Sequence, residues 1–232
     1  MITVKKLVKR FGHKVVLRGL DFDVQPGEFV ALLGPNGAGK TTFLRVLASL
    51  SRPSLGVVQV AGFRLPDESA AVRARLGVVS HLPLLYGDLT ADENLRFYAR
   101  MYNISKYELR ITEVLEMVGL ENRRRDLVRT YSRGMQQRLA IGRAVLHDPD
   151  VILFDEPYTG LDQDASSMLD EVLKTVAAKG RTVVMTSHDL ARAEELATRF
   201  DILSHGVITA TGNRNEFGNG NLLSFYKKAL AG

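Results

Sequence analysis

The run Gly34-Pro-Asn-Gly-Ala-Gly-Lys-Thr41 narrows the possible folds of this chain more than any other feature. Its two outer glycines stand five residues apart and Lys-Thr follows, which is the phosphate-loop pattern. An apolar segment ending at Leu33 precedes the run, and a helix-forming sequence beginning at Thr41 follows it. In that context backbone N–H groups and the helix dipole converge on one point, which favours a bound polyphosphate. The alternative is a glycine-rich turn that fits the pattern by chance.

Residues within this run have separate expected tasks. The glycines let the main chain wrap closely around phosphate oxygens. We expect Lys40 to reach the β- and γ-phosphates of a nucleotide, and the Thr41 hydroxyl to join the ligand shell of a magnesium ion. The run therefore predicts a site for a polyphosphate together with Mg²⁺.

Two adjacent carboxylates end a second apolar segment, Val151-Ile-Leu-Phe-Asp155-Glu156-Pro. The C-terminal tips of strands are where α/β proteins place their ligands. We expect Asp155 to face the magnesium shell, and Glu156 to orient or deprotonate a water that attacks the γ-phosphate. Alone, such a pair is more often an ordinary loop start, but beside a phosphate loop it favours nucleotide hydrolysis.

Two further residues carry weaker signals. Ser132 is placed to cap a helix that runs through Leu139 and Ala144, and composition alone indicates an ordinary helix cap. His188 follows the strand-like run Thr182 to Thr186. A lone histidine at a strand end is usually a structural hydrogen-bonding group, but this strand is expected to lie beside the one that carries Glu156.

The apolar periodicity predicts an α/β fold with a parallel core. Strand-like runs occur at Ile2 to Val8, Leu20 to Val24, Glu28 to Leu33, Val57 to Val60, Val151 to Phe154 and Thr182 to Thr186. Helical patterns begin at the capping box Thr90-Ala-Asp-Glu93, continue through Ile111, Val114, Leu115 and Val118, and recur over about Ser166 to Ala178. We expect one domain, 1–232, whose core comprises 1–81 and 150–232 and whose residues 82–149 form a helical insertion.

Composition excludes several classes of protein. Apolar residues make up 45% and charged residues 25% of the 232 residues, as in globular proteins. Apolar runs fall well short of the roughly 18 residues that span a bilayer, and the N-terminus lacks signal-peptide features, so we expect a cytoplasmic product. The absence of cysteine excludes disulfides, thiolate zinc sites and iron–sulfur clusters. The net charge of +5 permits anionic partners, and the run Arg123 to Arg125 is expected to be a solvated turn.

In this order and spacing, the four elements closely resemble those of the ATP-binding-cassette (ABC) ATPases, from about Ile2 to Gly212. The resemblance implies a P-loop NTPase fold with a mixed or parallel core sheet, an N-terminal antiparallel β-subdomain and an inserted α-helical subdomain. It implies catalytic roles for Lys40, Glu156 and His188, and magnesium binding by Thr41 and Asp155. The implied ATP-binding residues are Phe11, which would stack on adenine, Gly34, Pro35, Asn36, Gly37, Ala38, Gly39, Lys40, Thr41, Thr42, His81, Ser132, Gly134 and Asp162.

In that family two such domains face each other head to tail. The resemblance therefore implies that the chain works with a second copy of itself or a homologous ATPase subunit. Ser132 and Gly134, within the signature segment Tyr131 to Gln137, would contact the γ-phosphate bound by the other chain. It further implies separate integral membrane subunits driven by ATP hydrolysis, with this chain peripheral at the cytoplasmic face of the cell membrane and without a nucleic-acid partner.

The chain departs from the family pattern at two places. Arg133 and Met135 stand where the usual signature has a glycine and a glutamine, a variant similar to that of many exporter-type members. His81 aligns with a glutamine that normally reaches magnesium, and imidazole is a poor magnesium ligand. We expect His81 to act through water or mainly as a coupling residue.

The segment from His81 to Tyr102 resembles the haem-exporter ATP-binding subunit of the cytochrome c maturation system. Haem export is therefore the expected function. The alternatives are an exporter of lipid, drug or polysaccharide, a soluble ABC ATPase that acts on nucleic acid in repair or translation, and a module that senses ATP without hydrolysing it.

Overall fold

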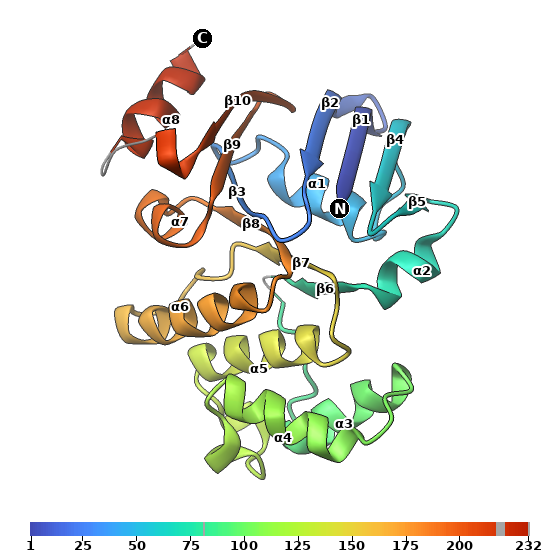
Figure 1. Cartoon of the computed structure of the whole chain (residues 1–232), viewed down its shortest axis with the longest axis vertical. Coiled ribbons are helices and arrows are strands. Elements are labelled where there is room, and N and C mark those ends of the chain that lie inside the picture. The colour runs from blue at the N-terminus through green and yellow to red at the C-terminus, as the bar shows by residue number, and fades with distance from the viewer. Residues whose placement is uncertain (81, 217–220, 232) are drawn as a thin grey trace.

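The structure, a computed structural model, describes residues 1–80, 82–216 and 221–231. Two β-sheets and a layer of helices make up the fold (Figure 1). The smaller sheet is antiparallel, with strand order β2-β1-β4-β5. Its strands are β1 (Ile2–Phe11), β2 (Lys14–Val24), β4 (Leu55–Val60) and β5 (Phe63–Leu65). Alternate apolar residues of β1 and β2, such as Ile2, Val4 and Leu20, are buried, which matches the alternation in the sequence.

The larger sheet has strand order β10-β9-β3-β8-β7-β6 and is parallel except for β10, which pairs antiparallel with β9. Its strands are β3 (Phe29–Leu33), β6 (Leu76–Val79), β7 (Val151–Asp155), β8 (Thr182–Ser187), β9 (Arg199–Ser204) and β10 (Val207–Asn213). Strand β8 lies between β3 and β7, with Leu33 opposite Ser187 and Asp155 opposite Thr186. The three C-terminal tips are therefore neighbours, which confirms the expected placement of β8 beside β7.

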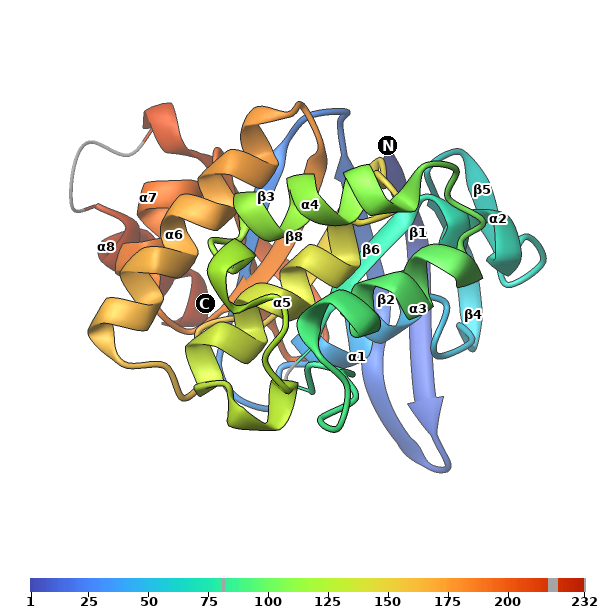
Figure 2. The same ribbon diagram turned by 90° about the horizontal axis from the view of Figure 1, so that it is seen from below.

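Helices cover the large sheet, and several of them lie between β6 and β7 in chain order, although these two strands are paired neighbours in the sheet. The α-helices are α1 (Lys40–Leu47), α2 (Ser69–Ala74), α3 (Ala91–Met101), α4 (Tyr107–Met117), α5 (Arg133–Val145), α6 (Gln163–Ala178), α7 (Leu190–Leu196) and α8 (Leu222–Ala231). Three short 3₁₀ turns follow α4 and β10: η1 (Glu121–Arg123), η2 (Val128–Thr130) and η3 (Arg214–Glu216). Helices α3, α4 and α5 form the insertion (Figure 2). One buried cluster joins them to the sheet, and a second lies between α1 and the two sheets.

Local capping signals in the sequence are confirmed. Thr90 caps α3 in a complete capping box with Glu93, and the Ser132 hydroxyl accepts a hydrogen bond of 3.2 Å from Met135 N at the start of α5. Helix α6 begins three residues before the expected Ser166, because the Asp162 carboxylate accepts from Ala165 N at 2.8 Å and caps it.

Two sequence expectations need correction. The β1–β2 hairpin is longer than the expected strands ending at Val8 and beginning at Leu20, since polar and apolar side chains do not alternate in its outer part. The arginine run is only partly a solvated turn, because Arg124 is half-buried and its guanidinium contacts Asp92, with Nε 3.1 Å from Oδ1.

His147 is the site of a predicted pH dependence of stability. Its ring stacks on Tyr102 with centroids 4.0 Å apart, and burial lowers the pKa of His147 to about 4. The unfolded pKa is about 6.5, so the fold favours the neutral ring. This contribution is complete above about pH 6.5 and is lost as the pH falls toward 4, and it amounts to about 3 kcal/mol.

Urea unfolding at pH 7 and pH 4.5 tests this prediction. We expect His147→Phe, which keeps a stacking ring but cannot take up a proton, to lose less free energy of unfolding between the two pH values than the wild type does. Parallel pH dependences in the two proteins would contradict the prediction.

Candidate functional site

The phosphate-loop residues connect β3 to α1, and two glycines in the loop are required by geometry. Gly34 has φ 153°, and a Cβ there would lie 2.1 Å from the carbonyl oxygen of Leu203. Gly39 has φ 113° and is the N-cap of α1, where a Cβ would meet Leu17 at 2.9 Å. Only glycine fits both positions. The chain can therefore turn tightly from the sheet and open the N-terminus of α1 toward the pocket.

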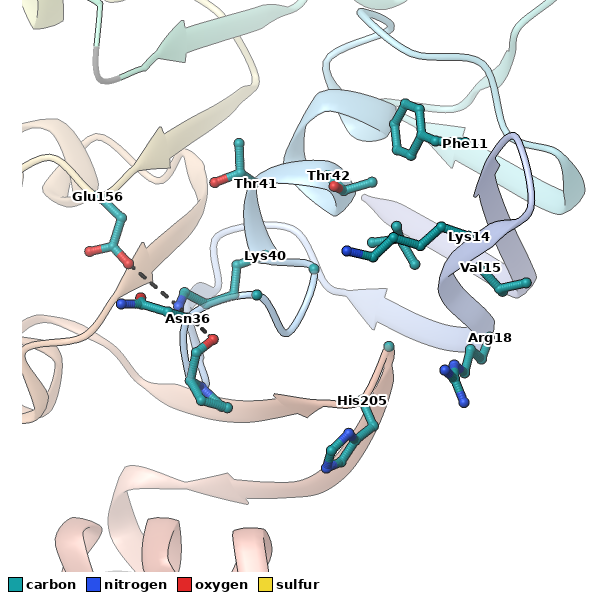
Figure 3. Close-up of a pocket in the computed structure, with 15 residues that line it drawn as sticks. Phe11, Lys14, Val15, Arg18, Asn36, Lys40, Thr41, Thr42, Glu156 and His205 are labelled. Atoms are coloured by element: carbon teal, nitrogen blue, oxygen red, sulfur yellow. Dashed lines mark hydrogen bonds and ion pairs between the residues drawn. The ribbon is translucent and has the colours of Figure 1, made fainter.

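Lys40, the first residue of α1, is held inside the loop that precedes it. Its ammonium donates to the carbonyl oxygen of Gly34 at 2.7 Å and lies 3.6 Å from Glu156 Oε1. Only 7% of Lys40 is exposed. The charge of Lys40 is therefore fixed at the junction of the loop and the acidic strand end (Figure 3).

Asp155 and Thr41 bring oxygen atoms together at the end of β7. The Thr41 hydroxyl donates to Asp155 Oδ1 at 3.1 Å, and the Thr186 hydroxyl donates to the same oxygen at 2.8 Å. Hydroxyl and carboxylate oxygens are the ligands that Mg²⁺ prefers, so this pair fits the expected ion. Among the described residues, no group of three or more His, Asp or Glu side chains is arranged to hold a metal ion.

Glu156 points away from this pair and contacts His188. Its backbone has φ 51°, a left-handed conformation, and its N–H donates to the Thr186 hydroxyl at 3.0 Å. Its Oε2 lies 2.6 Å from His188 Nδ1. A carboxylate can only accept, so Nδ1 carries the proton in this pair. The adjacent residues Asp155 and Glu156 thus contact different partners.

Lys40, Thr41 and Glu156 border an open cavity of about 560 Å³, within the usual range of ligand pockets, about 300–1,000 Å³. Asp155 and His188 contact these residues but do not line the cavity themselves. Phe11 stands at its far edge with 54% of its surface exposed, available for stacking (Figure 3). The expected residues that line the cavity are Phe11, Pro35, Asn36, Gly37, Gly39, Lys40, Thr41, Thr42 and Glu156. Gly34 and Ala38 are buried parts of the same loop.

The cavity has a second wall that the sequence did not indicate. This wall of the cavity is formed by two segments, β2 with Lys14, Val15, Val16 and Arg18, and the β9–β10 turn with His205 and Gly206. Arg18 N donates to the carbonyl oxygen of Gly206 at 2.9 Å, which joins the two elements. The basic side chains of Lys14 and Arg18 add positive potential beside the phosphate loop. Their assembly depends on contacts between distant segments, so no local motif reveals them.

Ser132, Gly134 and Asp162 do not line this cavity. Ser132 and Asp162 cap α5 and α6, and the backbone of Gly134 approaches Ala165 so closely that a Cβ would lie 2.7 Å from its side chain. The two helix starts therefore lie together on a part of the surface separate from the loop. His81 lies outside the described residues.

No described helix combines the length and apolar character needed to cross a bilayer.

A family model described as "ABC transporter" matches residues 17–159. Among curated proteins, the Nod factor export ATP-binding protein I of Cupriavidus metallidurans is 38% identical, covering 93% of this chain and 72% of its own. The linearmycin resistance ATP-binding protein LnrL of Bacillus subtilis is 36% identical, covering 93% of this chain and 70% of its own.

Solved structures agree with these matches. An ATP-binding subunit of an ABC transporter superposes with a TM-score of 0.88 at 34% identity, covering 99% of both chains. A dimeric ATP-binding cassette in a post-hydrolysis state, bound to ADP and Pi, superposes with a TM-score of 0.82 at 30% identity, covering 94% of this chain and 100% of that chain.

Proposed function

The chain belongs to the ABC transporter family of ATP-binding proteins, and from that premise we propose that it is the ATP-hydrolysing subunit of an exporter with separate membrane subunits. It has the ABC ATPase fold and is an ATPase. The observation that carries the proposal is that Lys40, Glu156 and His188 meet beside the phosphate loop. Glu156 Oε2 lies 2.6 Å from His188 Nδ1, and Glu156 Oε1 lies 3.6 Å from Lys40 Nζ.

Each of these residues has a different role in the proposed mechanism of hydrolysis. Lys40 and the loop N–H groups bind the β- and γ-phosphates. Glu156 accepts a hydrogen bond from the attacking water while His188 holds the carboxylate. The water oxygen bonds to the γ-phosphorus while a water proton passes to Glu156, and the bond from phosphorus to the bridging oxygen breaks, giving ADP and phosphate; Glu156 then returns the proton to solvent. Thr41 and Asp155 would hold Mg²⁺, which offsets phosphate charge.

We propose that the working unit is a head-to-tail dimer with a second copy or a homologous subunit. Ser132, Gly134 and Asp162 lie away from their own cavity, as residues that serve the nucleotide of another chain must do. A solved structure of a chain 30% identical to this one is described as dimeric, which supports a dimer as the working unit. Phe11 would stack on the adenine of the chain's own nucleotide.

Export is the proposed direction, because relatives are named for Nod factor export and linearmycin resistance. Neither name mentions haem, so an exporter of another cargo is the first candidate. Haem export is the second, and its support is the resemblance of segment 81–102. Aromatic residues there have structural contacts, since the Tyr98 hydroxyl donates to Leu84 O at 2.6 Å and the rings of Tyr86 and Phe97 pack edge to face.

Purification of the tagged chain from detergent-solubilised membranes of its own host tests the proposed function. We expect membrane-spanning transport subunits to co-purify and to raise ATP turnover, which would also support a peripheral location of the chain at the membrane. Cytochrome c maturation subunits in the complex would favour haem over the first candidate. A tight, salt-sensitive complex with duplex DNA or ribosomes, without membrane subunits, would overturn the exporter proposal.

A further inference from the structure

Arg192, on α7, contacts three segments that surround the candidate catalytic pair. Its guanidinium pairs with Asp170 of α6, with Nη1 2.5 Å from Oδ2, and its Nη2 donates to Gln163 Oε1 at 3.4 Å. Its Nε lies 3.4 Å from Asp189 Oδ2. The same guanidinium lies over the Tyr158 ring, 5.1 Å from the centroid. One side chain therefore ties α6, the start of α7 and the loop after Glu156.

Tyr158 and Asp170 complete a cluster that is shielded from water. The Tyr158 hydroxyl donates to Asp170 Oδ1 at 2.6 Å, so both oxygens of Asp170 are engaged. Side-chain exposure is 14% for Arg192 and 10% for Asp170. Burial and the Asp170 carboxylate raise the pKa of Tyr158, so its hydroxyl stays protonated as the donor. Charged and hydrogen-bonded groups interact strongly in such surroundings.

The cluster is connected directly to both candidate catalytic loops. Tyr158 is two residues after Glu156, in a turn where Thr159 N donates to the Glu156 carbonyl at 3.2 Å. Asp189 is the residue after His188 and caps α7 by accepting from Arg192 N at 3.2 Å. Each loop therefore has one anchor on Arg192.

The contact between Glu156 and His188 needs such an anchor. The His188 side chain is 66% exposed, so packing does not fix its ring. Contacts between exposed side chains contribute little stability by themselves, because ordering both side chains costs entropy. The buried cluster of Arg192, Tyr158 and Asp170 restrains the backbone beside Glu156 and His188, which the exposed histidine ring cannot do by its own packing.

We propose that Arg192 is a positioning residue for ATP hydrolysis, which, through Tyr158, Asp170 and Asp189, holds the loops of Glu156 and His188 at hydrogen-bonding distance. This inference rests on the proposed function, since it assumes that Glu156 and His188 act in hydrolysis. It assigns Arg192 no contact with the nucleotide.

A double-mutant cycle in ATP turnover tests the inference. We expect Arg192→Met to lower kcat by about tenfold or more, with KM for ATP unchanged, because the catalytic loops lose their alignment and the phosphate loop does not. In a His188→Ala background the same substitution should lower kcat by less than about twofold, since the contact that it positions is already gone.

Two further variants guard against a simple loss of folding. Tyr158→Phe removes the hydroxyl bonded to Asp170 but keeps the ring under Arg192, so it should show a smaller loss of kcat with the same dependence on His188. Arg181→Met is the matched control, because Arg181 is 6% exposed, pairs with Asp148 and precedes β8 at the end opposite to His188. It should lower stability without changing kcat of the folded protein.

The outcomes separate this inference from the proposed function. If Arg192→Met and His188→Ala lower kcat by independent factors, or if Arg181→Met matches Arg192→Met, the cluster is merely structural and the inference fails. If the folded Tyr158→Phe protein keeps wild-type kcat, the Tyr158 link fails. If Glu156→Gln retains full turnover, the proposed role of Glu156 in hydrolysis fails, and the positioning role of Arg192 fails with it; if membrane subunits do not co-purify with the chain, the exporter proposal fails whatever the cycle shows.

Discussion

Glu156→Gln is expected to abolish steady-state ATP turnover while ATP binding survives and an ATP-bound dimer accumulates. Glutamine has nearly the same shape as glutamate but cannot take a proton from water, and loss of a general base lowers rates about 10²- to 10⁴-fold. The substitution also removes a negative charge that lies 3.6 Å from the Lys40 ammonium and near the expected γ-phosphate. Binding should therefore be retained or tightened.

Phosphate release and size-exclusion chromatography with and without Mg-ATP check this result. Glu171→Gln is the matched control, since Glu171 is an exposed residue of α6 paired with Lys174, remote from the cavity lining. It should hydrolyse ATP and behave in solution as the wild type does. A Glu156→Gln protein that stays monomeric with ATP, or that continues to release phosphate, would contradict the assignment.

Lys40→Ala is expected to weaken ATP binding by about 10- to 100-fold, because hydrogen bonds to charged groups contribute about 1.5–3 kcal/mol each. The ammonium is already oriented by its bond to Gly34 O, at 2.7 Å, so little entropy is spent when phosphate binds. Turnover at subsaturating ATP should fall by at least the same factor.

Titration calorimetry with ATP and with ADP measures this loss. The loss should be larger for ATP than for ADP, since the γ-phosphate lies nearest to Lys40 in the proposed mechanism. Lys174→Ala is the control and should bind both nucleotides normally. The Lys174 side chain is 51% exposed and pairs with Glu171. Equal affinities of Lys40→Ala and wild type would mean that the lysine does not face the phosphates.

The parts of the site that the sequence predicted are those that depend on short-range geometry. The phosphate loop lies in one turn between β3 and α1, and the divergence of Asp155 and Glu156 follows from the chain leaving β7. Helix caps at Thr90 and Ser132 also involve residues three apart. Such features need no knowledge of the rest of the chain.

Other parts depend on distant segments and could not be predicted in this way. Lys14, Arg18 and His205 share a wall only because β2 meets the β9–β10 turn. The ion pair of Asp170 with Arg192 joins residues 22 apart on two helices. An acid and a base at that separation are common in any helical sequence, so their pairing has no local signature.

The ladder that joins β3, β8 and β7 has a consequence for how such chains vary in evolution. Strand side chains alternate between faces, so one inserted or deleted residue within β7 or β8 would turn Asp155 or Thr186 to the opposite face and separate the pair, now at 2.8 Å. Changes of length are tolerable at the exposed Gly12–His13 turn, which bears none of these groups. Lineages of this chain should therefore gain and lose residues at the hairpin tip while the strand lengths stay constant.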